Sequence, residues 1–221
     1  MHFKIHFSLK IIFCITAFFF ASCKSSTAPH DGTTIEQLYP MSYGNYWIYE
    51  NQTYNPDGSI TDDITQTTEI TGTKNFNEHP GFLADFGNGS PPITFFYSGS
   101  DLYEVAPGSI DPTPFLILRY PMNSGEVFVV PDTANHNSNP DQQQIIFRGS
   151  NEPVTVSAGT FNCYHFSELF LSGTRALSDT SEVQELFFSA GIGLIENKIY
   201  SKDPRKLALA SLYQLKSYRV E

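Results

Sequence analysis

The chain has 221 residues, of which 13 are Lys or Arg and 23 are Asp or Glu, so its formal net charge is −10 at pH 7. This length is sufficient for one domain with a substantial hydrophobic core. Because a strongly acidic surface repels phosphates, neither nucleic acid nor an anionic membrane surface is expected as an electrostatic partner.

The first 22 residues have the features of a secretory signal. Lys4 and Lys10 supply positive charge, and residues 11–21 form an apolar run interrupted only by Thr16. A helix that spans a bilayer needs about 20 apolar residues, whereas a signal needs about 7–15. We therefore predict a cleaved signal at 1–22, which leaves 199 residues with a net charge of −12.

Residues 20–23 read Phe-Ala-Ser-Cys and resemble the lipobox of bacterial lipoproteins, in which Leu is usual at the first position. The resemblance implies cleavage before Cys23, a diacylglycerol on its sulfur, and a further acyl chain such as palmitate on the new amine. Two acyl chains give stable membrane attachment, whereas one does not. Lys24 favours the outer membrane, because related families retain lipoproteins in the inner membrane by an Asp at that position. An ordinary secretory signal is the alternative.

A small, polar, Pro- and Gly-containing stretch follows, and we assign residues 23–34 to a flexible tether and 35–221 to one domain. Thr33 and Thr34 precede Glu36 and Gln37 at capping-box spacing, which predicts one helical turn over residues 35–38.

Short segments of β-branched and aromatic residues, separated by turn-forming residues, fill the rest of the chain. This pattern predicts antiparallel strands, and the Asn-Pro-Asp-Gly run at 55–58 is strong turn chemistry. The predicted strands do not alternate with helices, so a parallel α/β core is not expected. The predicted strands comprise residues 46–50, 64–73, 81–86, 93–97, 102–105, 115–120, 126–130, 143–148, 154–156, 161–171, 183–188, 194–200 and 209–218.

The last segment has leucines at positions 209, 212 and 215, a spacing that also suits a helix, but we favour a strand. The sequence therefore predicts an all-β domain with a curved antiparallel multi-stranded sheet or open barrel; a β-sandwich is the alternative.

Cys163 is the one cysteine left if the signal is removed and Cys23 is lipidated, so no intramolecular disulfide is expected. Its strand-like surroundings predict a small buried residue. His165 shares its face of the strand, which leaves a catalytic thiolate as the weaker alternative.

The sequence contains no Gly-x-Ser-x-Gly, His-Glu-x-x-His or Cys-x-x-Cys motif, so neither enzymatic activity nor a cofactor is expected. A hydrolase would require acids that converge only in the fold. Two oxygen-rich loops, at 55–63 and 132–141, could supply calcium ligands, but turn-forming Asx residues explain them, and no metal is expected. The acids considered are Glu168, Glu182, Glu185 and Glu196, and the histidines of the domain and tether are His30, His79, His136 and His165.

Two segments carry a further resemblance. Residues 154–163 fit the pattern V-x-V-x-A-G-T-F-x-C, and residues 188–196, with the run Ala-Gly-Ile-Gly-Leu-Ile at 190–195, resemble the pattern A-x-G-x-G-L-[IV]. With the Gly-Asn-Tyr-Trp run at 44–47, they are similar to uncharacterised envelope lipoproteins of diderm bacteria. The resemblance covers most of the domain, implies no settled activity, and suggests an open curved sheet of the lipoprotein carrier type.

These observations predict a membrane-anchored envelope lipoprotein that acts as a non-enzymatic binding module for a hydrophobic ligand, a glycan or an envelope protein. In an open curved sheet, alternate residues of 115–120 and 161–171 would line the concave face. A structural or assembly lipoprotein without a small ligand, and the hydrolase, are the alternatives.

Overall fold

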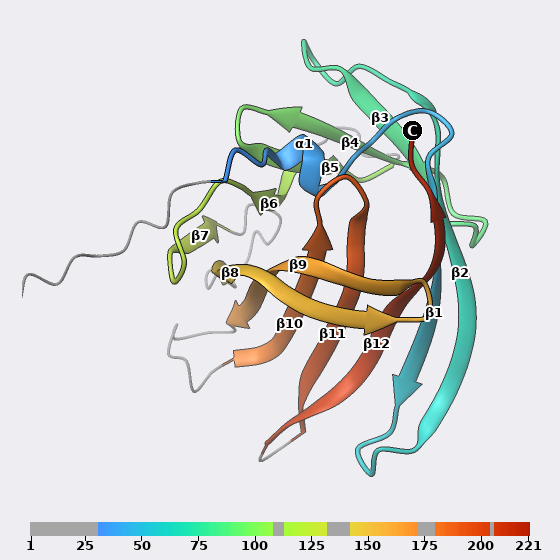
Figure 1. The fold of residues 1–221 in the computed structure, drawn as a ribbon, viewed down its shortest axis with the longest axis vertical. Helices are drawn as coiled ribbons and strands as arrows, with labels where there is room; N and C mark the ends of the chain where they lie inside the picture. Colours follow the sequence, from blue (N-terminus) through green and yellow to red (C-terminus); the bar gives the residue numbers. More distant parts are fainter. Residues whose placement is uncertain (1–30, 108–112, 132–141, 172–179, 204–205) are drawn as a thin grey trace, which may run out of the picture.

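The computed structural model describes residues 31–107, 113–131, 142–171, 180–203 and 206–221 (Figure 1). The predicted all-β fold is confirmed, because these residues form a sheet of twelve antiparallel strands and a single short helix. The elements are α1 (Ile35–Leu38), β1 (Tyr46–Tyr54), β2 (Ile60–Thr73), β3 (Gly81–Asp85), β4 (Ile93–Ser98), β5 (Asp101–Val105), β6 (Phe115–Arg119), β7 (Val127–Pro131), β8 (Gln142–Val156), β9 (Gly159–Leu171), β10 (Thr180–Ser189), β11 (Gly193–Asp203) and β12 (Lys206–Arg219).

The strands pair in the order β6-β5-β4-β3-β2-β1-β12-β11-β10-β9-β8-β7. Neighbours in the sheet are neighbours in the chain, except that β1 pairs with β12. β6 and β7, which follow each other in the chain, stand at the two ends of the sheet. The sheet therefore curves into a nearly closed barrel with one unsealed seam between β6 and β7.

Aromatic side chains fill one end of the barrel. The ring of Tyr39 lies 6.3, 6.1 and 6.1 Å from the rings of Trp47, Phe95 and Phe188, measured between centroids. Phe188 in turn packs edge-on against the fully buried Phe166 of β9. Because each such ring removes a large apolar area from water, this cluster is the main source of stability at that end.

The helix α1 lies against this cluster. Ile35 and Leu38 are fully buried, and the backbone N of Thr34 donates to Oε1 of Gln37 at 2.9 Å, as the predicted capping box requires. The backbone N of Gly191 donates to the carbonyl O of Gln37 at 2.7 Å. A single helical turn is unstable alone, so these tertiary contacts hold it.

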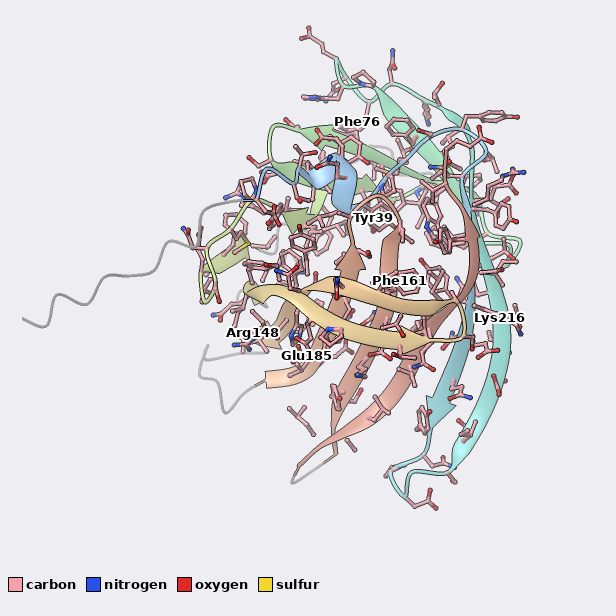
Figure 2. All side chains as sticks on the ribbon, viewed as in Figure 1. Tyr39, Phe76, Arg148, Phe161, Glu185 and Lys216 are labelled. Atoms are coloured by element: carbon pink, nitrogen blue, oxygen red, sulfur yellow. The ribbon has the colours of Figure 1, made fainter. Side chains whose placement is uncertain are left out.

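β8 and β9 form a long hairpin in which β9 pairs with β10, and β8 passes over β11 and β12 (Figure 1). At its tip, the backbone N of Ala158 donates to the carbonyl O of Leu215 in β12 at 3.1 Å. The ring of Phe161, labelled in Figure 2, lies 6.1 Å from that of Tyr218. The tip is therefore attached to a strand that it does not pair with in the sheet.

Two predicted strands, 143–148 and 154–156, are in fact parts of β8. The register with β9 shifts on both sides of Gly149, so the strand bends there without ending. The ambiguous segment at the C-terminus is a strand, since β12 pairs with both β1 and β11.

Gly193 combines a positive φ with a close approach to a core side chain. Its φ is +108°, and a Cβ placed there would lie 3.2 Å from Nε1 of Trp47. That nitrogen donates to the carbonyl O of Ile192 at 2.5 Å. A side chain at position 193 would therefore disturb the hydrogen bond of a core tryptophan.

Candidate functional site

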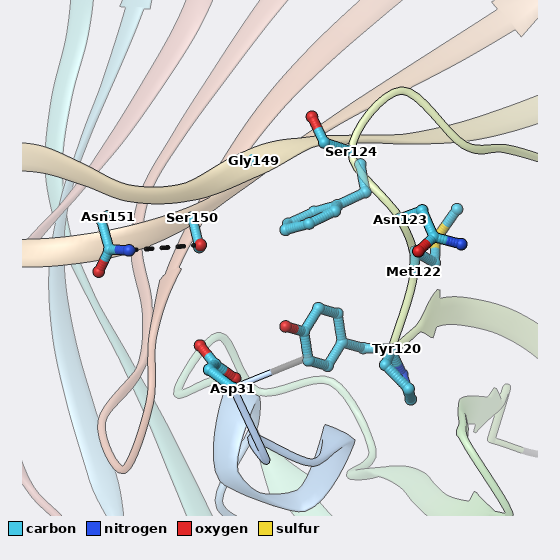
Figure 3. Close-up of a pocket in the computed structure, with 10 residues that line it drawn as sticks. Asp31, Tyr120, Met122, Asn123, Ser124, Gly149, Ser150 and Asn151 are labelled. Atoms are coloured by element: carbon cyan, nitrogen blue, oxygen red, sulfur yellow. Dashed lines mark hydrogen bonds between the residues drawn. The ribbon is translucent and has the colours of Figure 1, made fainter. Parts of the chain in front are cut away.

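A pocket of about 550 Å³ lies where three distant segments of the chain meet (Figure 3). Its walls are the loop after β6, the bulged part of β8, and Asp31 near the start of the described chain. Small-molecule sites usually have volumes of about 300–1,000 Å³. The lining residues are Asp31, Tyr120, Pro121, Met122, Asn123, Ser124, Phe147, Gly149, Ser150 and Asn151.

The loop wall is fixed by hydrogen bonds. The backbone N and Nδ2 of Asn123 donate to Oε2 of Glu126 at 2.8 and 3.0 Å. Oγ of Ser124 donates to the carbonyl O of Arg148 in β8 at 2.9 Å. The turn at 123–125 is therefore attached to β8, the opposite wall of the pocket.

The second wall exists because β8 is irregular. Its register with β9 shifts between Phe147 and Gly149 and again before Glu152, and the φ angles of Gly149 and Asn151 are +153° and +65°. Ser150 and Asn151 leave the ladder and are exposed at the pocket (Figure 3). The strand pattern of the sequence does not locate this wall, although a Gly-Ser-Asn run inside such a pattern can signal a bulge.

The floor of the pocket is aromatic. The ring of Tyr120 lies 5.5 Å from that of Phe147, 5.5 Å from that of Tyr164 and 6.1 Å from that of Phe166. Burial raises the pKa of Tyr120 well above its usual value, with the Asp31 carboxylate adding to the effect, so this hydroxyl stays neutral at physiological pH.

Asp31 ties the start of the described chain to the barrel. Its Oδ1 accepts a hydrogen bond from the backbone N of Thr33 at 3.0 Å, and its Oδ2 accepts one from the hydroxyl of Tyr164. Of the ten lining residues, Asp31 is the only carboxylate, and none is Lys, Arg or His. The pocket therefore combines a buried aromatic floor, an exposed amide and hydroxyl rim, and one acidic side chain.

Cys163 is buried with a free thiol, as predicted. Burial raises its pKa to about 12, and the charges of Glu196 and Glu152 act in the same direction. The thiol therefore stays protonated at neutral pH, which argues against the catalytic thiolate.

His165 interacts with two glutamates instead. Its Nδ1 lies 2.9 Å from Oε2 of Glu152, and its Nε2 lies 2.6 Å from Oε2 of Glu185. Oγ of Ser167 also donates to Glu185, at 2.6 Å, and accepts from Nε of Arg148 at 2.7 Å (Figure 2). Because Ser167 is fully buried, its hydroxyl is not accessible to a substrate from solvent.

The other glutamates considered for hydrolysis do not line the pocket either. Glu168 is buried, and burial raises its pKa to about 8; the charge of Glu182 adds to the rise and a hydrogen bond from Gln143 opposes it. Glu196 is paired with Nζ of Lys198 at 2.6 Å. No pair of glutamates therefore converges on a described ligand pocket.

The first oxygen-rich loop is a turn. Oδ1 of Asp57 accepts hydrogen bonds from N and Oγ of Ser59 at 2.9 and 2.6 Å. In the part of the chain that the structure describes, no three His, Cys, Asp or Glu side chains are placed to hold a metal ion. The second loop, with His136, lies outside the described residues.

The predicted lipidation site Cys23 and the histidine His30 of the predicted tether also lie outside the described residues. His79 stacks on Phe96 with 5.2 Å between ring centroids. None of the helices that the structure describes has the length and apolar character needed to cross a bilayer.

The predicted concave face is largely filled by side chains. Side chains alternate inward as expected and are buried in the core. They are Leu118 of β6, Tyr120 directly after β6, and Tyr164 and Phe166 of β9. A small cavity beside Tyr39 has a volume of about 150 Å³, below the usual range for ligand sites. The larger pocket beside Asp31 is therefore the stronger candidate site.

Comparison with known proteins yields remote similarities. No family model and no curated protein matches the chain. A presumed exported protein with YmcC-like fold from Bacteroides fragilis is 14% identical, with a TM-score of 0.49 over 82% of this chain and 98% of its own. A presumed lipoprotein from Parabacteroides distasonis is also 14% identical, with a TM-score of 0.47 over 86% of this chain and 100% of its own. Neither similarity assigns a family or an activity.

Proposed function

We propose that the chain is a lipid-anchored protein of the bacterial cell envelope that binds a ligand in the pocket beside Asp31 without transforming it. The charged start, the short apolar run and the Phe-Ala-Ser-Cys sequence at 20–23 support lipidation of Cys23. Lys24 supports the outer membrane as the site of attachment. Two acyl chains on one residue hold a protein on a membrane stably.

The position of the pocket relative to the anchor carries the proposal. Asp31 lines the pocket and follows Cys23 by eight residues. Eight residues span at most about 28 Å when fully extended. A lipidated Cys23 therefore keeps the pocket within that distance of the bilayer surface, and the ligand is one that is found there.

The chemistry of the pocket favours binding over catalysis. The carboxylate of Asp31 accepts hydrogen bonds from Thr33 and Tyr164. The hydroxyls of Ser124 and Ser150 have no histidine among the lining residues to act as a base. These groups can hold and orient a ligand through hydrogen bonds.

Metabolic labelling with an alkynyl fatty acid tests the anchor. We expect the wild-type chain to be labelled and found in the membrane fraction, and the Cys23→Ser variant to be neither. Cys14→Ser is the matched control, because it removes a cysteine of the predicted signal and should keep both properties. Retained labelling of the Cys23→Ser variant would contradict the proposal.

Native mass spectrometry of the full chain, extracted from membranes with detergent, tests the binding. We expect a bound mass that disappears in Ser150→Trp, which fills the pocket from its rim. Ser42→Trp, at an exposed serine that does not line the pocket, should keep it.

A further inference from the structure

We infer that the ligand of the pocket beside Asp31 is an uncharged sugar, as a free oligosaccharide or as the headgroup of a glycolipid. This inference deepens the proposed function and rests on it, because it takes this pocket as the binding site. The rim, the floor and the charge of the pocket each favour such a ligand.

The rim consists of groups that both donate and accept hydrogen bonds. Asn123, Ser124, Ser150 and Asn151 are exposed there, two with carboxamides and two with hydroxyls. Each sugar hydroxyl is itself both a donor and an acceptor, so a rim of this kind can satisfy several of them at once. A hydrocarbon chain would remove these polar groups from water and would form no hydrogen bonds with them.

The floor is apolar on the side away from the rim. Tyr120, Pro121, Met122 and Phe147 form it. One face of many pyranose rings carries mainly C–H groups, and such a face can lie on aromatic and aliphatic side chains while its hydroxyls point to the rim. An apolar surface with a few placed polar groups is the usual composition of small-molecule pockets.

The charge of the pocket opposes anionic ligands. Asp31 is the only ionisable side chain among the lining residues apart from the neutral Tyr120, and the Glu126 carboxylate accepts hydrogen bonds from the lining residue Asn123. Two cations adjoin lining residues in the sequence: Arg119 pairs with Asp101, and Arg148 directs its Nε to Ser167. Since the chain is also acidic overall, phosphates, fatty-acid carboxylates and uronic acids would meet repulsion without compensation.

An array of neutral and acidic glycans, probed with the full chain in a polyoxyethylene detergent, tests the inference. Alkyl glycoside detergents must be avoided, because their own headgroups would occupy the pocket. We expect binding to neutral oligosaccharides, weaker binding to their uronic-acid or phosphorylated counterparts, and no binding by Ser150→Trp.

Asn151→Gly provides a sharper variant, since it removes the carboxamide and keeps a backbone that tolerates a φ of +65°. Loss of one or two hydrogen bonds predicts an affinity about two- to tenfold lower. Asn77→Gly is the matched control, because Asn77 is exposed, has a φ of +51° and does not line the pocket. Its affinity should equal that of the wild type.

A short-chain digalactosyl diacylglycerol, used below its critical micelle concentration, distinguishes the two sources of sugar from each other. Tighter binding of the glyceride than of free digalactose indicates a lipid headgroup, and equal binding indicates a free oligosaccharide. If fatty acids or anionic glycans bind and Ser150→Trp blocks them, the sugar inference is wrong but the pocket stands. If Ser150→Trp changes no binding at all, the proposed function fails as well.

Discussion

Glu168 is a carboxylic acid on the same strand face as the core residue Phe166. Its cross-strand neighbour on β8 is Ile145, which is fully buried, and its neighbour on β10 is Gln184. Burial raises the pKa of Glu168 to about 8, whereas an unfolded glutamate titrates near pH 4.3. Between these values the folded chain retains a proton that the unfolded chain releases. The contribution of this group to stability is therefore complete below about pH 4 and is lost as the pH rises through about 8.

Glu168→Gln should remove this pH dependence, because glutamine has a similar shape and does not ionise. We expect the free energy of unfolding of the variant to exceed that of the wild type at pH 8–9 by a few kcal/mol, and the difference to shrink towards pH 5. Urea denaturation across this pH range measures it. Glu36→Gln, on the exposed side of α1, is the control. A difference that does not vary with pH would contradict the assignment.

The sequence predicts the burial and position of some side chains better than those of others. The burial of Cys163 follows from a small apolar residue in a strand. The burial of Glu168 does not, because alternation along a strand assigns residues to two faces without showing which face is covered. For the same reason, the pocket residues Ser150 and Asn151 could not be located before the bulge in β8 was known.

At the scale of elements, the ladder from Tyr164 to Leu171 joins β9 of the β8–β9 hairpin to β10, and side chains add to this attachment. His165 of β9 bridges Glu152 of β8 and Glu185 of β10, and its ring stacks on Phe187 at 4.3 Å between centroids. Both ring nitrogens face carboxylate oxygens, so the imidazolium form is the one that can donate to both. Although burial opposes its charge, hydrogen bonds from His165 and Ser167 hold the pKa of Glu185 below its usual value.

His165→Phe should loosen the hairpin, because it keeps the ring stack and removes both hydrogen bonds. The buried thiol of Cys163 is a reporter of this motion. We expect its alkylation to be slow in the native wild type, fast in denaturant, and about tenfold faster in the native variant, as a loss of about 1.5 kcal/mol predicts. Mass spectrometry of the peptide that contains Cys163 measures the rate. His79→Phe should leave the rate unchanged, and an unchanged rate in His165→Phe would show that other contacts hold the hairpin.

The sequence predicted most strands within a few residues, because turn-forming residues separate them clearly. It did not predict that 143–148 and 154–156 form one strand. The Gly-Ser-Asn run at 149–151 lies between them, and the same residue types occur in turns, which end a strand, and in bulges, which only bend it. The passage of the hairpin over β11 and β12 depends on distant contacts such as that of Ala158 with Leu215, and no local pattern encodes such a contact.

At the scale of the molecule, the barrel closes between β1 and β12 and remains unsealed between β6 and β7. The meander of neighbouring strands was predictable from short turns, but the closure was not, since it depends on the curvature of the whole sheet. β6 and β7 each pair on one side only, so side chains hold the seam together. The guanidinium of Arg119 lies 3.7 Å from the ring centroid of Phe128 and is fixed by two 2.6 Å hydrogen bonds to Asp101.

Phe128→Ala should therefore open the barrel at the seam before any other strand pair separates. Loss of the cation–π contact and of the half-buried ring predicts a decrease of about 1–3 kcal/mol in the free energy of unfolding. Hydrogen exchange should accelerate in β6 and β7 while exchange at the β1–β12 pairing stays slow, because those strands have partners on both sides. Val129→Ala, on the same strand with a side chain that is 43% exposed, should change neither quantity by more than about 0.5 kcal/mol. Uniform acceleration across all strands would instead mean that the barrel unfolds as one unit and that the seam is no weaker than the paired strands.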